Sequence, residues 1–407
     1  MIELGEYKKQ FEASFAGESE REHALAKAIS FGLPHSRMEN WKYTDLKPMH
    51  DICYAPSTSN TKLNNENLPA KTTGWPRLVF LNGQVVKKLS DPHALDLVST
   101  NKASINANYK DPDQVFECLN IALNNGGFEL TVPNGVNIDG LEVLFLFDGN
   151  QKQATHIRNT IHVEKGASLS ILLNYSDQFG QLGWVDVSND ITVESAASLV
   201  HYSDISAPNS RFINIRDAIA LNGGSYENHS LLMSCASARH EVEFFTKVEG
   251  SKAIINGAFL GGEGETLDTL TRANHLVPNC TSEQYFKGVV ATGGKTAFQG
   301  KVFVEKDAQL TVANQSCKNI ILDRSAEANI KPELLIYADD VKCAHGTTVG
   351  ELDEKALFYL EQRGITPKEA KTILINAFLE EILDNMPSQN IGACFSDKIA
   401  QWMSAKN

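Results

Sequence analysis

The feature that most constrains the fold is a stretch from about residue 76 to residue 347, in which short apolar runs alternate with corners of small, polar or acidic residues. The corners fall at Glu164–Ser168, Glu194–Ser198, Asn222–Ser225, Glu249–Lys252, Thr292–Lys295, Glu305–Ala308 and Arg324–Glu327. No helical pattern separates the runs, so we expect no alternation of strands with crossover helices. Many short strands with small corner residues predict a β-solenoid or a β-sandwich, and the irregular spacing does not decide between them.

The N-terminal part of the chain has a different pattern. Its first predicted helical positions are Leu4, Tyr7, Phe11 and Phe15, followed by a second helical run from Glu20 to Phe31. A polar stretch from Pro56 to Asn67 has too few apolar residues to offset the entropy of ordering it, and it predicts a linker. We therefore expect three parts: residues 1–75 as a helical region with a linker, 76–347 as the strand-rich core, and 348–407 as a helical domain.

After Gly350 the sequence again predicts helices. Asp353 is placed to cap a helix that Gly364 ends. Thr366 and Glu369 then have the spacing of a capping box around a new helix start. The apolar stripe of this helix comprises Ala370, Ile373, Leu374, Ala377, Phe378 and Ile382. We expect one face of the stripe to pack on its own domain and another face to dock a partner.

Length, charge and composition exclude several classes of protein. The chain has 407 residues, of which 42% are hydrophobic, which is sufficient for a large buried core. The formal net charge of −13 argues against a nucleic-acid partner, because phosphate binding needs a basic face. No run of about 18 apolar residues predicts a membrane span, and no signal peptide is recognisable at the start. The expected location is the cytoplasm.

The cysteines and histidines form no recognisable closed metal site. The cysteines are Cys53, Cys118, Cys235, Cys280, Cys317, Cys343 and Cys394. An odd number without a CxxC pair indicates neither a disulfide framework nor a zinc ribbon, and most should be small buried hydrophobes. The core histidines are His156, His162, His201, His229, His240 and His275. Their wide spacing predicts surface histidines or core histidines with hydrogen-bond partners.

The segment Tyr337–Gly350 carries the strongest candidate site. It has the pattern of a strand, in which alternate side chains share a face, so Cys343 and His345 should point the same way. A thiol beside an imidazole is able to hold a soft metal or to pass sulfur. Two ligands do not fill a coordination sphere, so further ligands would come from elsewhere, such as another chain. From the residues alone, a packed thiol and a hydrogen-bonded imidazole are the favoured interpretation.

Several motifs together resemble the SufD family of the SUF iron–sulfur cluster assembly machinery. They are Ile336–Gly350, Ala356–Ile365, the tryptophan motif Glu39–Leu46, Leu78–Gly83, Gln299–Val304 and Ala313–Ser316. The resemblance covers nearly the whole length. The sister subunit SufB is usually longer and carries an acidic segment where this chain has Lys342-Cys-Ala-His-Gly346, so the pattern favours SufD.

The resemblance implies a mainly β fold, a right-handed parallel β-helix flanked by N-terminal and C-terminal α-helical regions. It implies a scaffold and not an enzyme, with His345 and Cys343 as ligands of a transient, nascent iron–sulfur cluster shared with SufB at the end of the β-helix. The C-terminal helices would dock the ATPase SufC, and ATP would bind to that partner and not to this chain. Expressed alone, the chain would pair with itself through the same strand edge to give a two-fold homodimer.

Two other functions receive little support from the sequence. The stretch Thr292–Thr296 resembles a phosphate-binding loop, but the first glycine is misplaced and strands surround it, so no helix start is expected there. The alternative reading is a β-solenoid enzyme acting on carbohydrate or acyl donors, which needs clustered carboxylates or a catalytic histidine. The acids are scattered among the corners. Trp41 and Tyr43 are expected to be packing anchors.

Overall fold

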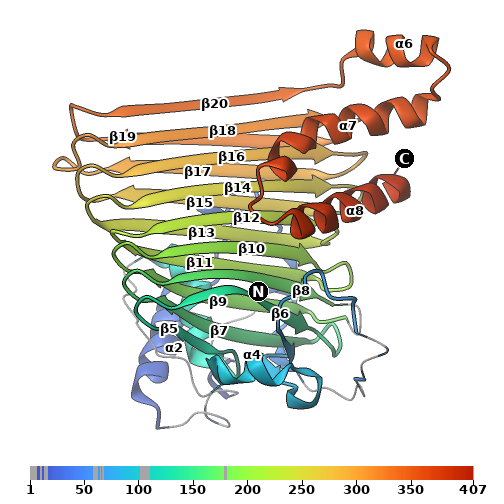
Figure 1. Cartoon of the computed structure of the whole chain (residues 1–407). Helices are drawn as coiled ribbons and strands as arrows, with labels where there is room; N and C mark the ends of the chain where they lie inside the picture. The colour runs from blue at the N-terminus through green and yellow to red at the C-terminus, as the bar shows by residue number, and fades with distance from the viewer. Residues whose placement is uncertain are drawn as a thin grey trace.

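A computed structural model describes residues 7–9, 12, 17–57, 63–64, 66, 68–100, 111–177 and 181–406. Strands of the described residues form two ten-stranded sheets that face each other (Figure 1). Sheet A contains β1 (Ala55–Pro56), β4 (Val98–Ser99), β5 (Glu129–Val132), β7 (Gln153–Val163), β9 (Trp184–Val193), β11 (Phe212–Asn222), β13 (Ser237–Val248), β15 (Thr266–His275), β17 (Lys295–Val304) and β19 (Glu327–Ile336). Sheet B contains β2 (Arg77–Leu81), β3 (Gln84–Val85), β6 (Asn137–Leu146), β8 (Ser168–Ser176), β10 (Ser198–Ser206), β12 (Ser225–Met233), β14 (Lys252–Gly261), β16 (Thr281–Val290), β18 (Val312–Ile321) and β20 (Lys342–Gly350).

Successive strands alternate between the two sheets, so the chain winds as a parallel β-solenoid. Within sheet B, for example, Leu199 of β10 lies in register between Leu169 of β8 and Tyr226 of β12. Corners stack as well: the Gly166 amide donates to the Ser195 carbonyl at 3.1 Å. Of the two predicted architectures, the solenoid is confirmed and the sandwich is wrong.

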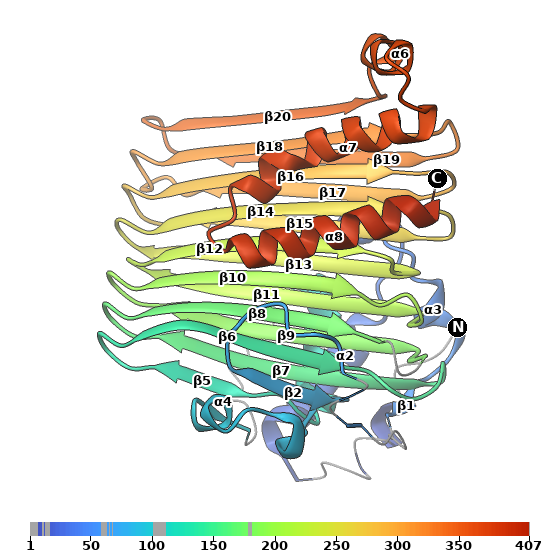
Figure 2. The same cartoon turned by 45° about the vertical axis from the view of Figure 1, so that its right-hand side comes forward.

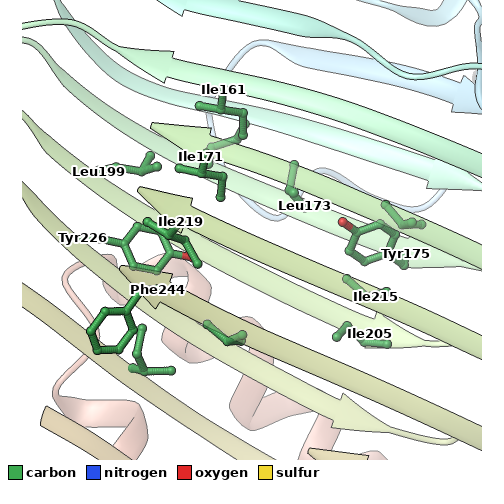
Figure 3. Packing of buried hydrophobic residues seen from close by; sticks show 14 of the residues in the cluster. Ile161, Ile171, Leu173, Tyr175, Leu199, Ile205, Ile215, Ile219, Tyr226 and Phe244 are labelled. Atoms are coloured by element: carbon green, nitrogen blue, oxygen red, sulfur yellow. The ribbon is translucent and has the colours of Figure 1, made fainter. Parts of the chain in front are cut away.

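Apolar side chains from both sheets fill the interior of the solenoid. Figure 3 shows Ile161, Ile215 and Ile219 of sheet A near Ile171 and Leu173 of sheet B. Each of these five side chains is at most 2% exposed. Because a strand directs alternate residues to opposite faces, the same strands offer a second set of positions to the outside, where helices cover them.

One prediction about the core was wrong: helices do lie within residues 76–347. Helix α5 (Val115–Leu123) is followed directly by the strands of the solenoid, and all of its residues except Glu117 are buried. Seven of its nine residues are apolar, and so short an apolar run is compatible with a buried strand as well as with a helix. The shorter elements are α4 (Pro92–Asp96), η3 (Lys87–Leu89) and η4 (Pro112–Gln114).

The N-terminal region covers the outer face of sheet A. Its elements are α2 (Ser19–Phe31), η1 (Glu39–Trp41) and α3 (Lys47–Asp51). Trp41 packs edge-on against Phe116 of α5, and Phe116 contacts Trp184 of β9. Trp41 is therefore the packing anchor that the sequence predicted. Of the first predicted helical positions, only Tyr7 belongs to the described residues, and parts of the predicted linker also lie outside them.

The C-terminal helices α7 (Pro367–Asp384) and α8 (Gln389–Lys406) cover the outer face of sheet B (Figure 2). The predicted capping box at Thr366 and Glu369 is present. The buried residues of α7 are Ala370, Ile375, Leu379 and Ile382. The predicted stripe left out Ile375 and Leu379, which are buried, whereas its member Ile373 is 44% exposed and lies outside the packed face.

Helix α6 (Glu354–Gln362) projects beyond β20 (Figures 1 and 2). Asp353 caps it as predicted, accepting from the Lys355 amide at 2.8 Å. None of its residues is buried, and Phe358 and Tyr359 are 60% and 55% exposed. Among the described helices, none is long and apolar enough to span a membrane.

The two ends of the solenoid are built differently. At the N-terminal end, β3 pairs antiparallel with β2, and β4 pairs antiparallel with β5. At the C-terminal end, β19 and β20 are the last strands of their sheets. We call these the closed end and the open end. The predicted site segment forms β20 at the open end.

Candidate functional site at the open end

Cys343 and His345 lie on the face of β20 that points toward the solenoid interior. Cys343 is in register with Ala313 of β18, and His345 is in register with Gln315. Ala313 and Gln315 are both buried, which identifies the inner face of this strand. The structure thus places the predicted pair on one face, as the alternation predicted.

The two side chains differ in exposure. His345 is exposed, whereas Cys343 is half-buried and packs against the interior cluster. An exposed imidazole at the rim is accessible to a ligand or a partner. The thiol is accessible from the open end only, because the core lies beneath it.

The backbone of β20 also has one free edge. The Lys342 amide donates to the Thr311 carbonyl at 2.9 Å, so the N–H of Lys342 points toward β18. In a parallel strand, successive residues direct their N–H and C=O groups to opposite neighbours. The N–H groups of Cys343, His345 and Thr347 consequently point away from β18, toward the side where sheet B has no further strand. Such an edge is a template for pairing with another strand.

Burial affects the chemistry of the thiol. Loss of hydration raises the pKa of Cys343 above its usual value, and a backbone hydrogen bond at Ala313 opposes this rise only in part. The thiol therefore carries its proton at neutral pH. A metal that binds this sulfur must displace that proton, so coordination at Cys343 depends on pH.

No group of three or more His, Cys, Asp or Glu residues that could hold a metal ion occurs within the described part of the chain. The open end offers one imidazole and one protonated thiol, which fits a shared or transient ligand set better than a closed structural site. The expectation that other ligands come from elsewhere stays a prediction.

The remaining cysteines and histidines have structural environments. Cys118, Cys235, Cys280 and Cys317 are buried, while Cys53 and Cys394 are half-buried. His156 lies 3.0 Å from Asp186, and His240 lies 3.1 Å from Asp217. These histidines are partnered core residues, as their wide spacing predicted.

Sequence reasoning missed a buried network of charged residues on the outer face of sheet A. Arg216 contacts Glu117 at 3.4 Å and Glu243 at 3.1 Å. Arg239 contacts Asp268 at 2.6 Å and lies 4.0 Å from the ring of Trp41. Most of these charges come from strands about thirty residues apart. Only β13, where Arg239, Glu241 and Glu243 occupy successive outward positions, gives a local signal.

This network has a structural role. Burial raises the pKa of Glu241, but Arg272, Arg239 and Arg216 together outweigh that effect and lower it to about 2. The carboxylate thus stays ionised and paired. A cavity of about 20 Å³ beside Trp41 and Arg216 is the size of a water molecule, which is too small for a substrate.

The predicted absence of a helix after the glycines of Thr292–Thr296 is confirmed. Gly293 has a φ of 67° in a tight corner, and β17 begins at Lys295. Lys295 forms an ion pair with Glu327 at 3.5 Å. A helix N-terminus, the usual cradle for phosphate, is missing from this described corner.

Together, the parallel β-solenoid, its flanking helices and a last coil with a free strand edge, one imidazole and one thiol define the class of protein by its fold. Comparison with known families identifies the class more closely: residues 145–378 match the SufBD core domain of SUF-system iron–sulfur cluster assembly. The chain belongs to the SufBD family, as its motifs predicted, and its role lies in iron–sulfur cluster assembly.

Relatives extend the similarity beyond the core. The iron–sulfur cluster assembly protein SufD of Escherichia coli is 28% identical over 377 residues, which cover 90% of this chain and 88% of that protein. An iron–sulfur cluster assembly SufBD family protein of Synechocystis is 29% identical over 384 residues, covering 88% and 85% of the two chains. Both similarities are longer than the segment 145–378 that matches the core domain.

Proposed function

We propose that this chain is a non-enzymatic scaffold subunit for iron–sulfur cluster assembly, which pairs through its open end with a SufB-like subunit. The observation that carries the proposal is the position of His345: it is an exposed imidazole on the last strand, beside a free backbone edge. A second β-solenoid that continued sheet B would bring its own side chains next to His345 and Cys343. The nascent cluster, as cargo, would then take ligands from both subunits.

The test is reconstitution of the complex with SufB-like and SufC-like subunits, comparing wild type with His345→Ala. We expect both to form the complex, and only the wild type to acquire iron and sulfide. His162→Ala is the matched control, because His162 is a partly exposed imidazole on β7, near the closed end. Equal loading of wild type and His345→Ala would contradict a role for His345. Failure of the wild type to form a complex would contradict the scaffold role.

The C-terminal helices supply the second proposed interface, for a SufC-like ATPase. Helix α6 buries none of its own residues, and Phe358 and Tyr359 present aromatic rings to solvent. Ile373 of α7 adds an exposed apolar side chain. Exposed aromatic residues of this kind are typical anchors of protein interfaces. ATP would then act through the partner, which would move α6 relative to the solenoid.

Capture experiments with the two partners separate the interfaces. Replacing Phe358 and Tyr359 together by serine should abolish binding of the SufC-like subunit and leave binding of the SufB-like subunit unchanged. If this variant lost binding to both subunits, the proposal of two separate interfaces would be contradicted.

In isolation, the chain should form a two-fold dimer through the open end, which analytical ultracentrifugation would detect as a doubled mass.

A further inference from the structure

A column of polar side chains runs beneath His345, inside the solenoid. Gln284 of β16, Gln315 of β18 and His345 of β20 lie in register on neighbouring strands. Neighbouring strands are about 4.8 Å apart. The amide of Gln315 is therefore within reach of the imidazole ring above it.

Only one of the two polar atoms in the side-chain amide of Gln315 has a hydrogen-bond partner within the described part of the chain. Its Nε2 donates to Oε1 of Gln284 at 3.3 Å. Its Oε1 is buried and has no hydrogen-bond partner among the described residues, although the residue is only 2% exposed. A buried acceptor left without a partner is destabilising, because it has lost its hydration and gained no hydrogen bond in return. This free acceptor lies directly beneath His345, whose imidazole could take it as a partner by a change of side-chain torsion.

The opposite sheet leaves room for this amide. Gly300 of β17 faces it, and a Cβ atom at Gly300 would lie 2.2 Å from Gln315 Nε2. Any larger residue would displace the amide from its column. The column beneath Cys343 is different, because the residue in register there is Ala313, whose side chain has no acceptor. Of the two predicted ligands, only His345 has a polar side chain in register below it.

We propose that Gln315 is a positioning residue for His345: its Oε1 accepts a hydrogen bond from one ring N–H of the imidazole. That bond would fix the tautomer and direct the other ring nitrogen out of the open end, toward the incoming cluster. Histidines that bind metals usually donate their second ring N–H to such an acceptor, which orients the ring and raises its basicity. The inference rests on the proposed function of His345 and adds the group that prepares it.

The experiment compares Gln315→Leu with Gln284→Leu in the full-length chain. Both variants break the hydrogen bond between the two glutamines, but only Gln315→Leu removes the acceptor beneath His345. NMR of the chain with ¹⁵N-labelled histidine side chains reports the tautomer of each neutral imidazole. The chain has eleven histidines, and comparison with His345→Ala assigns the signals of His345. We expect one dominant tautomer in the wild type and in Gln284→Leu, and a changed ratio in Gln315→Leu.

An unchanged ratio in Gln315→Leu, or equal changes in the two variants, would overturn the inference. Gln315→Met has the same length and no amide oxygen, and it replaces the leucine variant if that variant does not fold. In the reconstituted complex, Gln315→Leu should load cluster about tenfold less than Gln284→Leu, the usual size of the loss when the outer partner of a ligating histidine is removed.

The two proposals fail in different ways. Normal cluster loading by His345→Ala would overturn the proposed function, while the tautomer measurement would still decide whether the hydrogen bond exists. A loss of loading in His345→Ala with an unchanged tautomer in Gln315→Leu would leave the proposed function intact and remove the role of Gln315.

Discussion

The two ends of the solenoid use the same strands and the same pairing, yet one end is sealed and the other is not. At the closed end, Leu78 and Phe80 of β2 are completely buried, with β3 and α4 beside them. At the open end, no residue of β19 or β20 is buried. At the closed end, short strands and a helix cover the strand edges, which is a common way to prevent unwanted pairing. Among the described residues, the open end lacks such a cover.

This difference shows which end of the solenoid leaves strand edges to which a further coil can be added. Short antiparallel strands interrupt the parallel stack at the closed end, so another parallel coil cannot be added there. At the open end, the last coil presents inner side chains that a further coil would bury. The predicted ligands lie only on this coil. Four changes would break or sharpen the comparison.

The largest effect should come from equivalent truncations at the two ends. Phe80→Ala removes a ring that packs at a tilt against Phe128 and Phe145 and is 0% exposed, so it should cost about 3–5 kcal/mol of unfolding free energy. Leu334→Ala on β19 removes a half-buried side chain and should cost about 1 kcal/mol. Urea denaturation measures both. Equal losses would show that the open end is as tightly packed as the closed end.

Acid should destabilise the half of the solenoid near the open end. His275 of β15 is buried with Ser282 at 2.9 Å, and burial lowers its pKa from 6.5 to about 4. Between these values the unfolded chain binds more protons, so this contribution is present above pH 6.5 and is lost as pH falls toward 4. The loss is on the order of 3 kcal/mol. Unfolding free energies of wild type and His275→Gln, measured from pH 7.5 to 4.5, should converge by this amount; a constant difference would contradict it.

A proline at the free edge should weaken pairing without weakening the fold. Thr347→Pro removes an N–H that points away from β18, and edge strands tolerate proline at such positions. We expect about tenfold weaker association with the SufB-like subunit, equivalent to about 1.4 kcal/mol. Thr347→Val keeps the N–H and serves as the control. Unaltered association of the proline variant, measured by calorimetry, would exclude the edge of β20 as the pairing site.

The smallest effect on folding should come from α6. Replacing Phe358 and Tyr359 by serine removes two exposed rings, and the unfolding free energy should change by less than about 0.5 kcal/mol. The same variant should fail to capture the SufC-like subunit. A large loss of stability would show that α6 supports the solenoid and is not reserved for a partner.

The sequence predicted the features that depend on local pattern. The small residues at the corners predicted a β-solenoid or a β-sandwich, and the solenoid is the one found. The alternation of side chains along a strand predicted that Cys343 and His345 share a face. The capping box at Thr366 was recognisable because its residues lie within one helical turn. Helix α5 was missed because seven of its nine residues are apolar, and a short apolar run is compatible with either a helix or a strand.

Other features depend on the register between coils, which no local pattern contains. The ion pair of Arg239 with Asp268 and the column of Gln315 beneath His345 join residues about thirty positions apart. The packed face of α7 likewise depends on how the helix lies on sheet B, so the sequence did not reveal that Ile375 is buried and Ile373 exposed.

The placement of α7 and α8 has a mechanical consequence. A stack of coils that touch only their neighbours loses coils one at a time from its ends. Here a single apolar cluster joins both helices to side chains of β8, β10, β12, β14 and β16. Under tension along the stack, the coils from β8 to β16 should therefore yield as one block. Beyond them, the last coil meets this cluster through Leu322 and Leu352, which follow β18 and β20 and are only half-buried, so a partner pulling on α6 should reshape the last coil first.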